Sequence, residues 1–264
     1  LFENKLRDAL IKQHGLERVK RIEKIFSEPP HIALNIKQSL SKENYFEQFK
    51  GSSVHESHFR LSQNVSLMQM KGYHSGDWWV QSLSASLPIK LAPMDFKGKT
   101  VLDVCCAPGG KSFQLAEQGA ILTSIDKSER RLKLMRESLD RLNYDLDLIC
   151  KDVFEYQPKN LFDIILLDPP CTATGTIGKN PDLQFLNPLD KLEELSDIQQ
   201  KMLTRCASWL QDDGYIIYSV CSLLKQEGED QISRFLKKNK EFCLIHPKKK
   251  GYLDQEGYET NKES

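Results

Sequence analysis

Two cysteines stand just past the ends of two hydrophobic runs, and an aspartate accompanies one of them. Cys171 closes the stretch "IILLDPPC", in which Asp168 precedes the two prolines, and Cys221 closes the stretch "IIYSVC". A thiolate is a strong nucleophile, and a cysteine becomes reactive where its surroundings favour the thiolate. The pattern therefore indicates one site in which Cys221, Cys171 and Asp168 take part in covalent chemistry.

The remaining cysteines form no recognisable framework. The 264-residue sequence holds seven cysteines, an odd number, and no CxxC pair. This argues against a disulfide scaffold and against a zinc ribbon, so we expect no metal site and a reducing cytoplasm. We expect Cys150, Cys206 and Cys243 to be small buried hydrophobic side chains.

Short hydrophobic runs and helical stretches alternate from about residue 98 onward. The runs are rich in Val, Ile and Leu and lie at 100–104, 120–126, 146–152, 162–168 and 215–220. The helical stretches lie at 111–118, 128–142, 189–210 and 225–238. This alternation predicts an α/β fold in which a parallel sheet has helices on both faces.

Aspartates mark the ends of four of the expected strands. They are Asp103, Asp126, Asp152 and Asp168. Right-handed crossovers place the carboxyl ends of parallel strands along one edge of the sheet, where ligands bind. One such aspartate can be an ordinary helix cap, but four at equivalent positions favour a ligand site.

A glycine-containing loop follows the first of these strands. The stretch "DVCCAPGGKS" lacks the GxGxxG and GxxxxGK[ST] patterns, yet Gly109 and Gly110 allow backbone N–H groups to approach a ligand closely. Asp126 then stands where an acid binds ribose hydroxyls, and Asp152 could hold an adenine amino group. We predict a nucleoside-bearing cofactor, although spacing alone separates neither NAD from S-adenosylmethionine nor a ligand loop from a plain turn.

The N-terminal part has weaker patterns. Residues 1–28 have the apolar spacing of a helix, 31–36 read as a strand and 41–49 as a short helix. The sequence is therefore divided into a helical linker region at 1–29, a small accessory α/β region at 30–75 and a catalytic domain at 76–264.

Composition narrows the possible partners. Lys plus Arg and Asp plus Glu both number 37, so the net charge is zero and any nucleic-acid binding must come from a local patch. No apolar run approaches the ~20 residues of a membrane span, and no signal peptide is recognisable. The first residue is Leu, which leaves open that the chain is part of a longer protein.

Three segments together resemble the RNA cytosine-5 methyltransferases of the Sun/Nop family, and most closely its bacterial 16S ribosomal RNA type. They are "VLDVCCAPGGKS", "LLDPPCTATGTIGKNPD" and "YSVCSLLKQEGEDQI". "GDWWVQSLSASLP" and "HGLERVKRIEKIFSEPP" resemble the segments that precede the family's catalytic sheet. The resemblance implies a Rossmann-like methyltransferase sheet, S-adenosylmethionine as cofactor, an RNA-binding accessory region, and RNA as substrate, with ribosomal RNA ahead of transfer RNA.

The resemblance also implies roles for individual residues. In that family a thiolate adds to carbon 6 of cytosine, so that carbon 5 can accept a methyl group. Cys221 is then the nucleophile, Cys171 assists release of the methylated base, and Asp168 hydrogen-bonds the cytosine ring. The implied cofactor contacts are Cys105, Cys106, Ala107, Pro108, Gly109, Gly110, Lys111, Asp126, Asp152 and Asp168. Lys179 in "IGKNPD" is the implied RNA contact.

The sequence departs from the family pattern at four places. The usual DAPC is "DPPC", "TATG" replaces a motif that begins with Ser, Val220 replaces a Thr and Ser82 replaces an Asp. None of these changes removes a reacting group. The polar tail also lacks the final hairpin of the family's sheet, which leaves open a truncated C-terminus.

Two other functions remain open. "DPP" begins the motif of amino-methyltransferases, but that motif needs an aromatic residue where Cys171 stands. The second alternative is a non-catalytic RNA-binding or assembly factor on a methyltransferase scaffold. This alternative leaves both cysteines without a role. For RNA contacts, Tyr73, Trp78 and Trp79 could stack on nucleotides or pack inside the protein, and 246–250 is a basic candidate.

Overall fold

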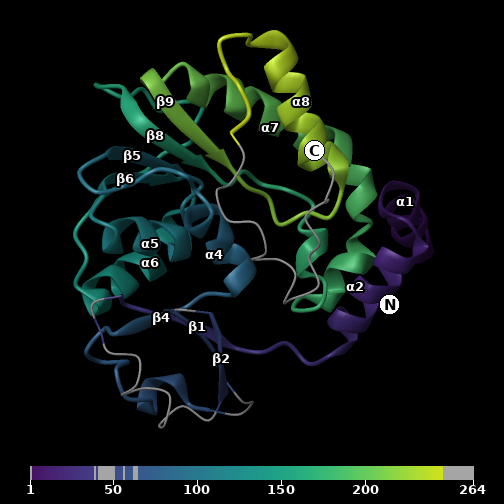
Figure 1. The fold of residues 1–264 in the computed structure, drawn as a ribbon, viewed down its shortest axis with the longest axis horizontal. Helices are drawn as coiled ribbons and strands as arrows, with labels where there is room; N and C mark the ends of the chain where they lie inside the picture. Colours follow the sequence, from purple (N-terminus) through teal and green to yellow (C-terminus); the bar gives the residue numbers. More distant parts are fainter. Residues whose placement is uncertain (1, 39, 41–50, 56, 62–64, 246–264) are drawn as a thin grey trace.

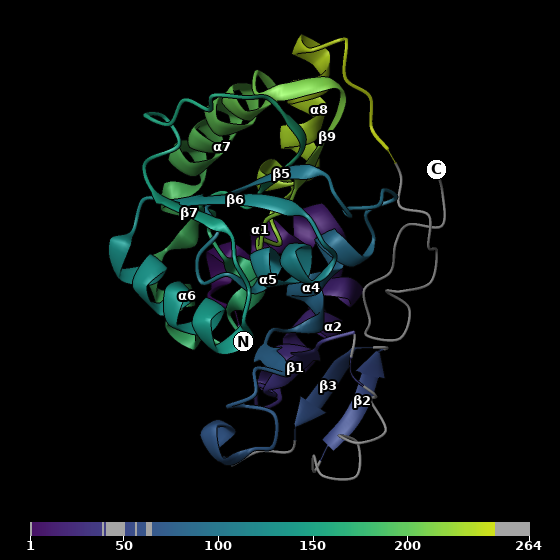
Figure 2. The same cartoon turned by 90° about the vertical axis from the view of Figure 1, so that its left-hand side faces the viewer.

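The chain folds around two β-sheets, one small and antiparallel and one large and parallel (Figure 1). The computed structural model describes residues 2–38, 40, 51–55, 57–61 and 65–245. The expected helix at 41–49, the basic stretch at 246–250 and the polar tail lie outside these residues. Figure 2 shows the small sheet below the large one.

The large sheet has five parallel strands in the order β7-β6-β5-β8-β9. They are β5 (Thr100–Val104), β6 (Ile121–Asp126), β7 (Asp147–Cys150), β8 (Phe162–Leu167) and β9 (Leu210–Tyr218). The predicted α/β fold with a Rossmann-like sheet is confirmed. β9 begins earlier than expected, and its pairing with β8 shifts register between Phe162 and Ile164.

Helices cover both faces of the large sheet (Figure 1). One face carries α4 (Leu83–Lys90), α5 (Gly110–Glu117) and α6 (Glu129–Leu142), and the other carries α7 (Leu192–Ala207) and α8 (Glu229–Lys238). Leu102 of β5 belongs to a core with Phe235 of α8. Its neighbour Val101 points the other way and belongs to a core with Leu115 of α5. Burial on both faces explains why these strands read as continuous hydrophobic runs.

Residues 1–28 form two helices, whereas the apolar spacing predicted one. α1 (Asn4–His14) and α2 (Leu16–Ser27) are separated by Gly15. Gly15 has a φ of +81°, a value that residues with a Cβ rarely adopt. The single-helix prediction was wrong because apolar periodicity continues across a break that only this glycine makes.

The two N-terminal helices pack against the loops that carry Cys171 and Cys221. Leu10 of α1 and Val19 of α2 are fully buried in a cluster with Ile177 and Leu224. Ile177 follows Cys171 in the chain, and Leu224 follows Cys221. The helices therefore support the same loops that the reactive cysteines occupy.

The small sheet has the strand order β2-β3-β1-β4. Its strands are β1 (Ala33–Ile36), β2 (Gly51–His55), β3 (His58–Leu61) and β4 (Trp78–Val80). β4 lies in the segment that the sequence assigned to the catalytic domain, yet it pairs with β1. Trp78 and Trp79 are 1% and 3% exposed, so they pack inside the protein and do not offer faces to RNA.

Two of the three cysteines expected in the interior lie on the surface. Cys206 is buried in α7, but Cys150 and Cys243 are exposed. Cys150 ends β7, an edge strand of the large sheet that has a neighbour on one side only. A hydrophobic run in the sequence does not distinguish an edge strand from a central one, which is why the prediction failed at Cys150.

In the described part of the chain, no helix combines the length and the apolar character of a membrane span. The same residues contain no group of three or more His, Cys, Asp or Glu side chains arranged to hold a metal ion.

Candidate active site

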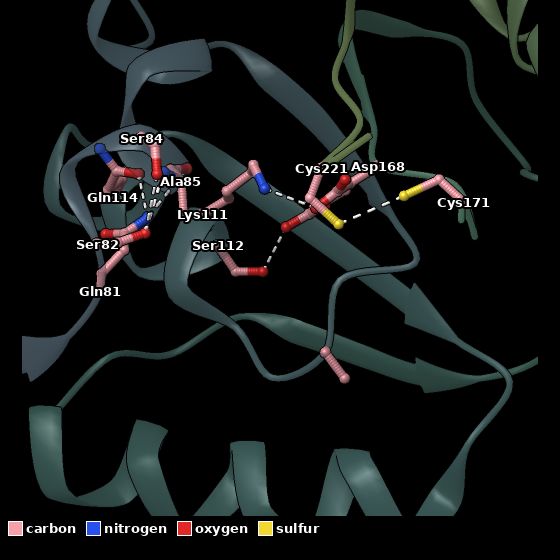
Figure 3. Close-up of polar contacts among 12 residues, drawn as sticks. Gln81, Ser82, Ser84, Ala85, Lys111, Ser112, Gln114, Asp168, Cys171 and Cys221 are labelled. Atoms are coloured by element: carbon pink, nitrogen blue, oxygen red, sulfur yellow. Dashed lines mark hydrogen bonds and ion pairs between the residues drawn. The ribbon is translucent and has the colours of Figure 1, made fainter. Parts of the chain in front are cut away.

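The candidate site lies where the connections of the parallel sheet change direction. β6 lies on one side of β5 and β8 on the other, so the chain leaves β5 and β8 in opposite directions at the carboxyl edge, where sheets of this topology form their ligand-binding crevice. Lys111, in the first turn of α5, reaches across: its Nζ lies 2.6 Å from Oδ2 of Asp168, which follows β8 (Figure 3). The structure thus joins the expected cofactor loop to the expected base-binding acid.

The loop 105–109 is fastened to the end of β6 by Asp126. The backbone N–H of Ala107 donates to Oδ2 of Asp126 at 3.2 Å, and that of Ser128 donates to Oδ1 at 2.9 Å. Cys105 has a φ of +62°, and the peptide bond before Pro108 is cis. Each carboxylate oxygen has a second lone pair, so Asp126 can shape this loop and still accept a ribose hydroxyl.

The next acid along the sheet edge is Asp152, which follows β7. Its Oδ1 accepts from the N–H of Phe154 at 2.9 Å, and its Oδ2 has no hydrogen bond to any described residue. A free carboxylate oxygen suits a donor such as the adenine amino group. The loop 105–111, Asp126 and Asp152 therefore fit a nucleoside-bearing cofactor, and they are the residues that would hold it.

Of the two glycines in this loop, Gly109 has less room for an added side chain than Gly110. It has a φ of +105°, and an added Cβ would lie 2.6 Å from Cζ of Phe113 and 2.9 Å from Cγ of Met135. We expect Gly109→Ala to lower the free energy of unfolding by about 1–3 kcal/mol and to weaken cofactor binding, measured by denaturant titration and calorimetry. Gly98→Ala is the matched control, because Gly98 has a positive φ but open space around it. Equal losses in both variants would contradict the predicted collision.

The two reactive cysteines lie side by side. Cys171 follows β8, Cys221 follows β9, and their sulfurs are 3.3 Å apart (Figure 3). Cys221 is exposed and Cys171 is half-buried. Figure 3 also shows Cys221 beside Asp168. A sulfur that solvent reaches, next to the crevice, has the access that a nucleophile toward a bound base requires.

The surroundings of the two sulfurs favour a thiolate at Cys221. The hydrogen bond from Cys171 and the positive charge of Lys111 lower the pKa of Cys221, against the opposing effects of burial and of Asp168. The same hydrogen bond, burial and the charge of Glu227 raise the pKa of Cys171. These shifts favour Cys171 as the donor of the pair and Cys221 as the thiol that ionises first.

Two ionisable groups close to the crevice are held in the interior. Asp103 is 1% exposed and accepts a hydrogen bond from Ser112 of α5, and burial raises its pKa to about 7. Burial also raises the pKa of Cys105 to about 12, so this thiol stays protonated near neutral pH. Of the four aspartates at strand ends, Asp103 and Asp126 are buried, at 1% and 4% exposed, whereas Asp152 and Asp168 are partly exposed.

A buried network that the sequence did not reveal joins the two cysteine loops. Glu227 is fully buried and accepts from the N–H of Thr172 at 2.9 Å, from the hydroxyl of Thr172, and from Nε2 of Gln199 at 2.9 Å. Oγ1 of Thr172 also lies 3.0 Å from Oγ of Ser222. A hydroxyl residue directly after each cysteine was the available signal, but nothing in the sequence pairs these hydroxyls with an acid at 227.

The first helix holds the loop after Cys221. Gln13 of α1 accepts from the N–H of Lys225 at 2.9 Å and donates to Oε1 of Gln226 at 2.9 Å. Nε2 of His14 lies 2.7 Å from the carbonyl oxygen of Leu223. These polar contacts fix the loop from the N-terminal side, in addition to the apolar cluster described above.

The other sequence-predicted positions have simpler surroundings. Lys179 is exposed between η2 (Thr174–Thr176) and η3 (Pro181–Leu186), outside the hydrogen-bonded cluster of the cysteine loops. Ser82 caps α4, and its hydroxyl accepts from the N–H of Ala85 at 3.4 Å. Serine and aspartate both serve well as N-caps, so this departure from the family pattern keeps the cap.

Residues 88–262 match the model of the protein family described as 16S rRNA methyltransferase RsmB/F. The chain belongs to this family. The matched segment contains the whole parallel sheet, the loop 105–111, Asp168 and both reactive cysteines. The expected family is thereby confirmed, and S-adenosylmethionine is confirmed as the cofactor of a methyltransferase of this kind.

Individual relatives agree with the assignment to the RsmB/F family. The Ribosomal RNA small subunit methyltransferase B of Pseudomonas syringae pv. tomato is 34% identical over 224 residues, which are 79% of this chain and 49% of that protein. The protein of the same name from Shewanella oneidensis is 40% identical over 151 residues, 55% of this chain and 35% of that protein. The chain thus spans about half or less of the length of the curated relatives it matches.

A solved structure agrees as well. The crystal structure of a methyltransferase homolog protein from Pyrococcus horikoshii has a TM-score of 0.73 and 26% sequence identity, and the match covers 87% of this chain and 77% of that one. The fold of this RsmB/F family member therefore agrees with a solved structure over most of the chain.

Proposed function

We propose that this protein transfers a methyl group from S-adenosylmethionine to carbon 5 of a cytosine in RNA, with 16S ribosomal RNA as the first candidate and transfer RNA as the alternative. The observation that carries the proposal is the pair of sulfurs 3.3 Å apart, beside Asp168 and the cofactor loop. Methyl transfer to a nitrogen or an oxygen has no use for two adjacent thiols. The names of the relatives support a ribosomal RNA substrate.

Cys221 is the proposed nucleophile. Its thiolate attacks carbon 6 of cytosine, a sulfur–carbon bond forms, and the electron pair of the ring double bond moves to carbon 5, which becomes nucleophilic. S-adenosylmethionine, when bound, supplies the methyl group. Water then takes the proton on carbon 5, the electron pair of that C–H bond re-forms the ring double bond, and the sulfur–carbon bond breaks so that Cys221 leaves as the thiolate.

Asp168 and Lys111 are proposed to face the base. Asp168 uses Oδ2 for Lys111, and its side chain is 31% exposed, so Oδ1 is available to accept from the amino group of cytosine. The ammonium group of Lys111 offers positive charge where electron density grows during attack on carbon 6. Lys111, in the first turn of α5, and Asp168, directly after β8, both lie at the switch point, which fixes them relative to the cofactor.

Three further assignments belong to the same proposal. Cys171, the protonated partner of Cys221, assists release of the methylated base. Lys179 and the accessory region at 30–75 contact RNA. The free cysteines suit a reducing cytoplasm.

The alkylation rate of Cys221 reports its thiolate. Because its pKa is lowered, we expect the rate with iodoacetamide to rise with pH and to reach half its maximum at a lower pH than the rate of a free thiol does. In Cys171→Ala the donor is lost, so the midpoint moves to higher pH. Mass spectrometry of the labelled peptide gives both midpoints, and identical midpoints would contradict the assigned hydrogen bond.

The test of the proposed function is incubation with radiolabelled S-adenosylmethionine and unmodified 16S ribosomal RNA, followed by mapping of 5-methylcytosine. We expect label at carbon 5 of a defined cytosine. Label on another base or on an exocyclic nitrogen would overturn the proposal. Cofactor binding without transfer to any cytosine-containing RNA would favour a non-catalytic RNA-binding factor.

A further inference from the structure

We propose that Glu227 is a positioning residue for the two cysteines: its buried carboxylate fastens the loop after β8 to the loop after β9. Its charge, beside the same loops, adds to the effects of the Cys221 hydrogen bond and of burial that raise the pKa of Cys171. The catalytic consequence of this inference rests on the proposed function. The geometric part does not, because it concerns the separation of two sulfurs and can be measured without RNA.

The burial of Glu227 requires an explanation. Glu227 is the last residue of η5 (Lys225–Glu227) and is 0% exposed. Burying a carboxylate costs several kcal/mol unless hydrogen bonds replace the lost water. The two donors on Thr172 and the amide of Gln199 supply these bonds, so the acid is retained at a position that links two loops.

The carboxylate also sets the direction of the hydroxyl groups between the loops. A carboxylate only accepts, so the hydroxyl of Thr172 must donate to Glu227. Oγ1 of Thr172 is then left to accept from the hydroxyl of Ser222 at 3.0 Å. On the other side, Thr174 accepts from the N–H of Leu223 at 2.8 Å and lies 3.2 Å from Oγ of Ser222. One negative charge therefore orders hydroxyls on both loops.

The two backbones touch at the same place. The N–H of Gly175 donates to the carbonyl oxygen of Cys221 at 2.9 Å, and a Cβ at position 175 would lie 2.8 Å from that oxygen. Such close contact leaves the loops no room to slide past each other. The distance between the sulfurs of Cys171 and Cys221 is then set by the network that holds these backbones together.

Further bonds anchor Glu227 to the rest of the domain. Gln199 of α7 donates to Glu227 and also to the carbonyl oxygen of Pro170, the residue before Cys171. The hydroxyl of Tyr218, the last residue of β9, donates to the carbonyl oxygen of Glu227 at 2.8 Å. The acid thus ties the cysteine loops to a helix and to the end of a strand.

The charge of Glu227 acts on the proton as well as on the geometry. The titratable and charged groups that act on the two thiols include Lys111, Asp168 and Glu227, and Tyr218 adjoins Cys171. Glu227 raises the pKa of Cys171, whereas Lys111 lowers that of Cys221. Both effects place the proton on Cys171 and the negative charge on Cys221.

Three variants separate these effects. Glu227→Ala removes the acceptor, Glu227→Gln keeps the shape but removes the charge, and Glu229→Gln makes the same change at an exposed acid two positions further on. We expect Glu227→Ala to lower kcat about 100-fold, the usual cost of a misplaced reacting group, with the KM values for RNA and cofactor within about 3-fold of wild type. Glu227→Gln should lower kcat by less than Glu227→Ala does, and Glu229→Gln should have the kcat of wild type.

Two measurements on the thiols distinguish positioning from a merely structural role: the rate of disulfide formation and the distribution of iodoacetamide label between the two cysteines. A merely structural role of Glu227 would leave both unchanged. Hydrogen peroxide oxidises the neighbouring thiols to a disulfide, two thiols and one peroxide giving one disulfide and two waters, and the rate reports the separation of the sulfurs. We expect the rate of disulfide formation to fall at least about 10-fold in Glu227→Ala. This loss is smaller than the expected loss of kcat, because forming a disulfide requires less exact placement of the sulfurs than methyl transfer does. In Glu227→Gln we expect iodoacetamide label to move from Cys221 toward Cys171, because the charge that holds the proton on Cys171 is gone.

The outcomes are distinguishable. A folded Glu227→Ala variant with wild-type kcat and a wild-type disulfide rate overturns the inference. So does a Glu227→Gln variant whose label stays on Cys221 at every pH. If wild-type protein transfers no methyl group yet the disulfide rate and labelling respond as expected, then the proposed function fails and the positioning role of Glu227 stands.

Discussion

Cys221→Ala is expected to abolish methyl transfer, by more than about 10⁴-fold, while the protein stays folded and still binds S-adenosylmethionine. The reason is chemical. Carbon 5 of cytosine becomes nucleophilic only while a sulfur is bonded to carbon 6, and alanine supplies no sulfur. Cys221 is exposed and packs against little, so its truncation leaves no large cavity. Filter-bound radioactivity from labelled cofactor measures the loss.

Matched variants show whether this loss is specific. Cys243→Ala changes another exposed cysteine, which follows α8 in the chain, and is expected to retain full activity. Cys221→Ser offers a poorer nucleophile of similar size and should be as inactive as alanine. Substantial turnover by Cys221→Ala would refute covalent attack by this residue.

Cys171→Ala is expected to accumulate a covalent protein–RNA adduct and to lose multiple turnover. Attack by Cys221 and methyl transfer remain possible, but the neighbour that assists departure of the sulfur is missing. The adduct survives denaturation and appears as a slower band on a denaturing gel. Because Cys171 also donates to Cys221, the adduct should form more slowly near neutral pH than at pH 9.

The double variant identifies the bonded residue. Cys171→Ala combined with Cys221→Ala should form no adduct under any condition. An adduct in Cys221→Ala and none in Cys171→Ala would exchange the two roles and make Cys171 the nucleophile. That outcome would also require the proton of the pair to reside on Cys221, contrary to the influence of Lys111 and Glu227.

The sequence predicted the catalytic sheet and the pairing of its reactive loops well, for physical reasons. Parallel strands buried on both faces must be continuously hydrophobic, as in 162–167, and their carboxyl ends must share one edge. Loops that follow such strands are therefore neighbours whatever their separation in the chain. The positions of Cys171 and Cys221 after two such strands therefore predict that they lie in one site.

Features that depend on tertiary contacts were not predictable in the same way. Glu227 reads as one acid among several in "KQEGED", and its burial follows only from the donors that surround it. Trp78 and Trp79 carry both apolar area and a polar N–H, so their types fit an RNA surface as well as a core. Burial decided between the two, since both indoles find partners inside the protein.

The contacts of α1 have a consequence for how the protein folds. Gln13 and Gln226 are 213 positions apart in the chain, and contacts of such long range form slowly because a large loop must close first. During synthesis from the N-terminus, Leu6 and Leu10 cannot join their apolar cluster until the segment around Leu224 has emerged. The loop that carries Cys221 is therefore completed late, although α1, which holds it, is synthesised well before it.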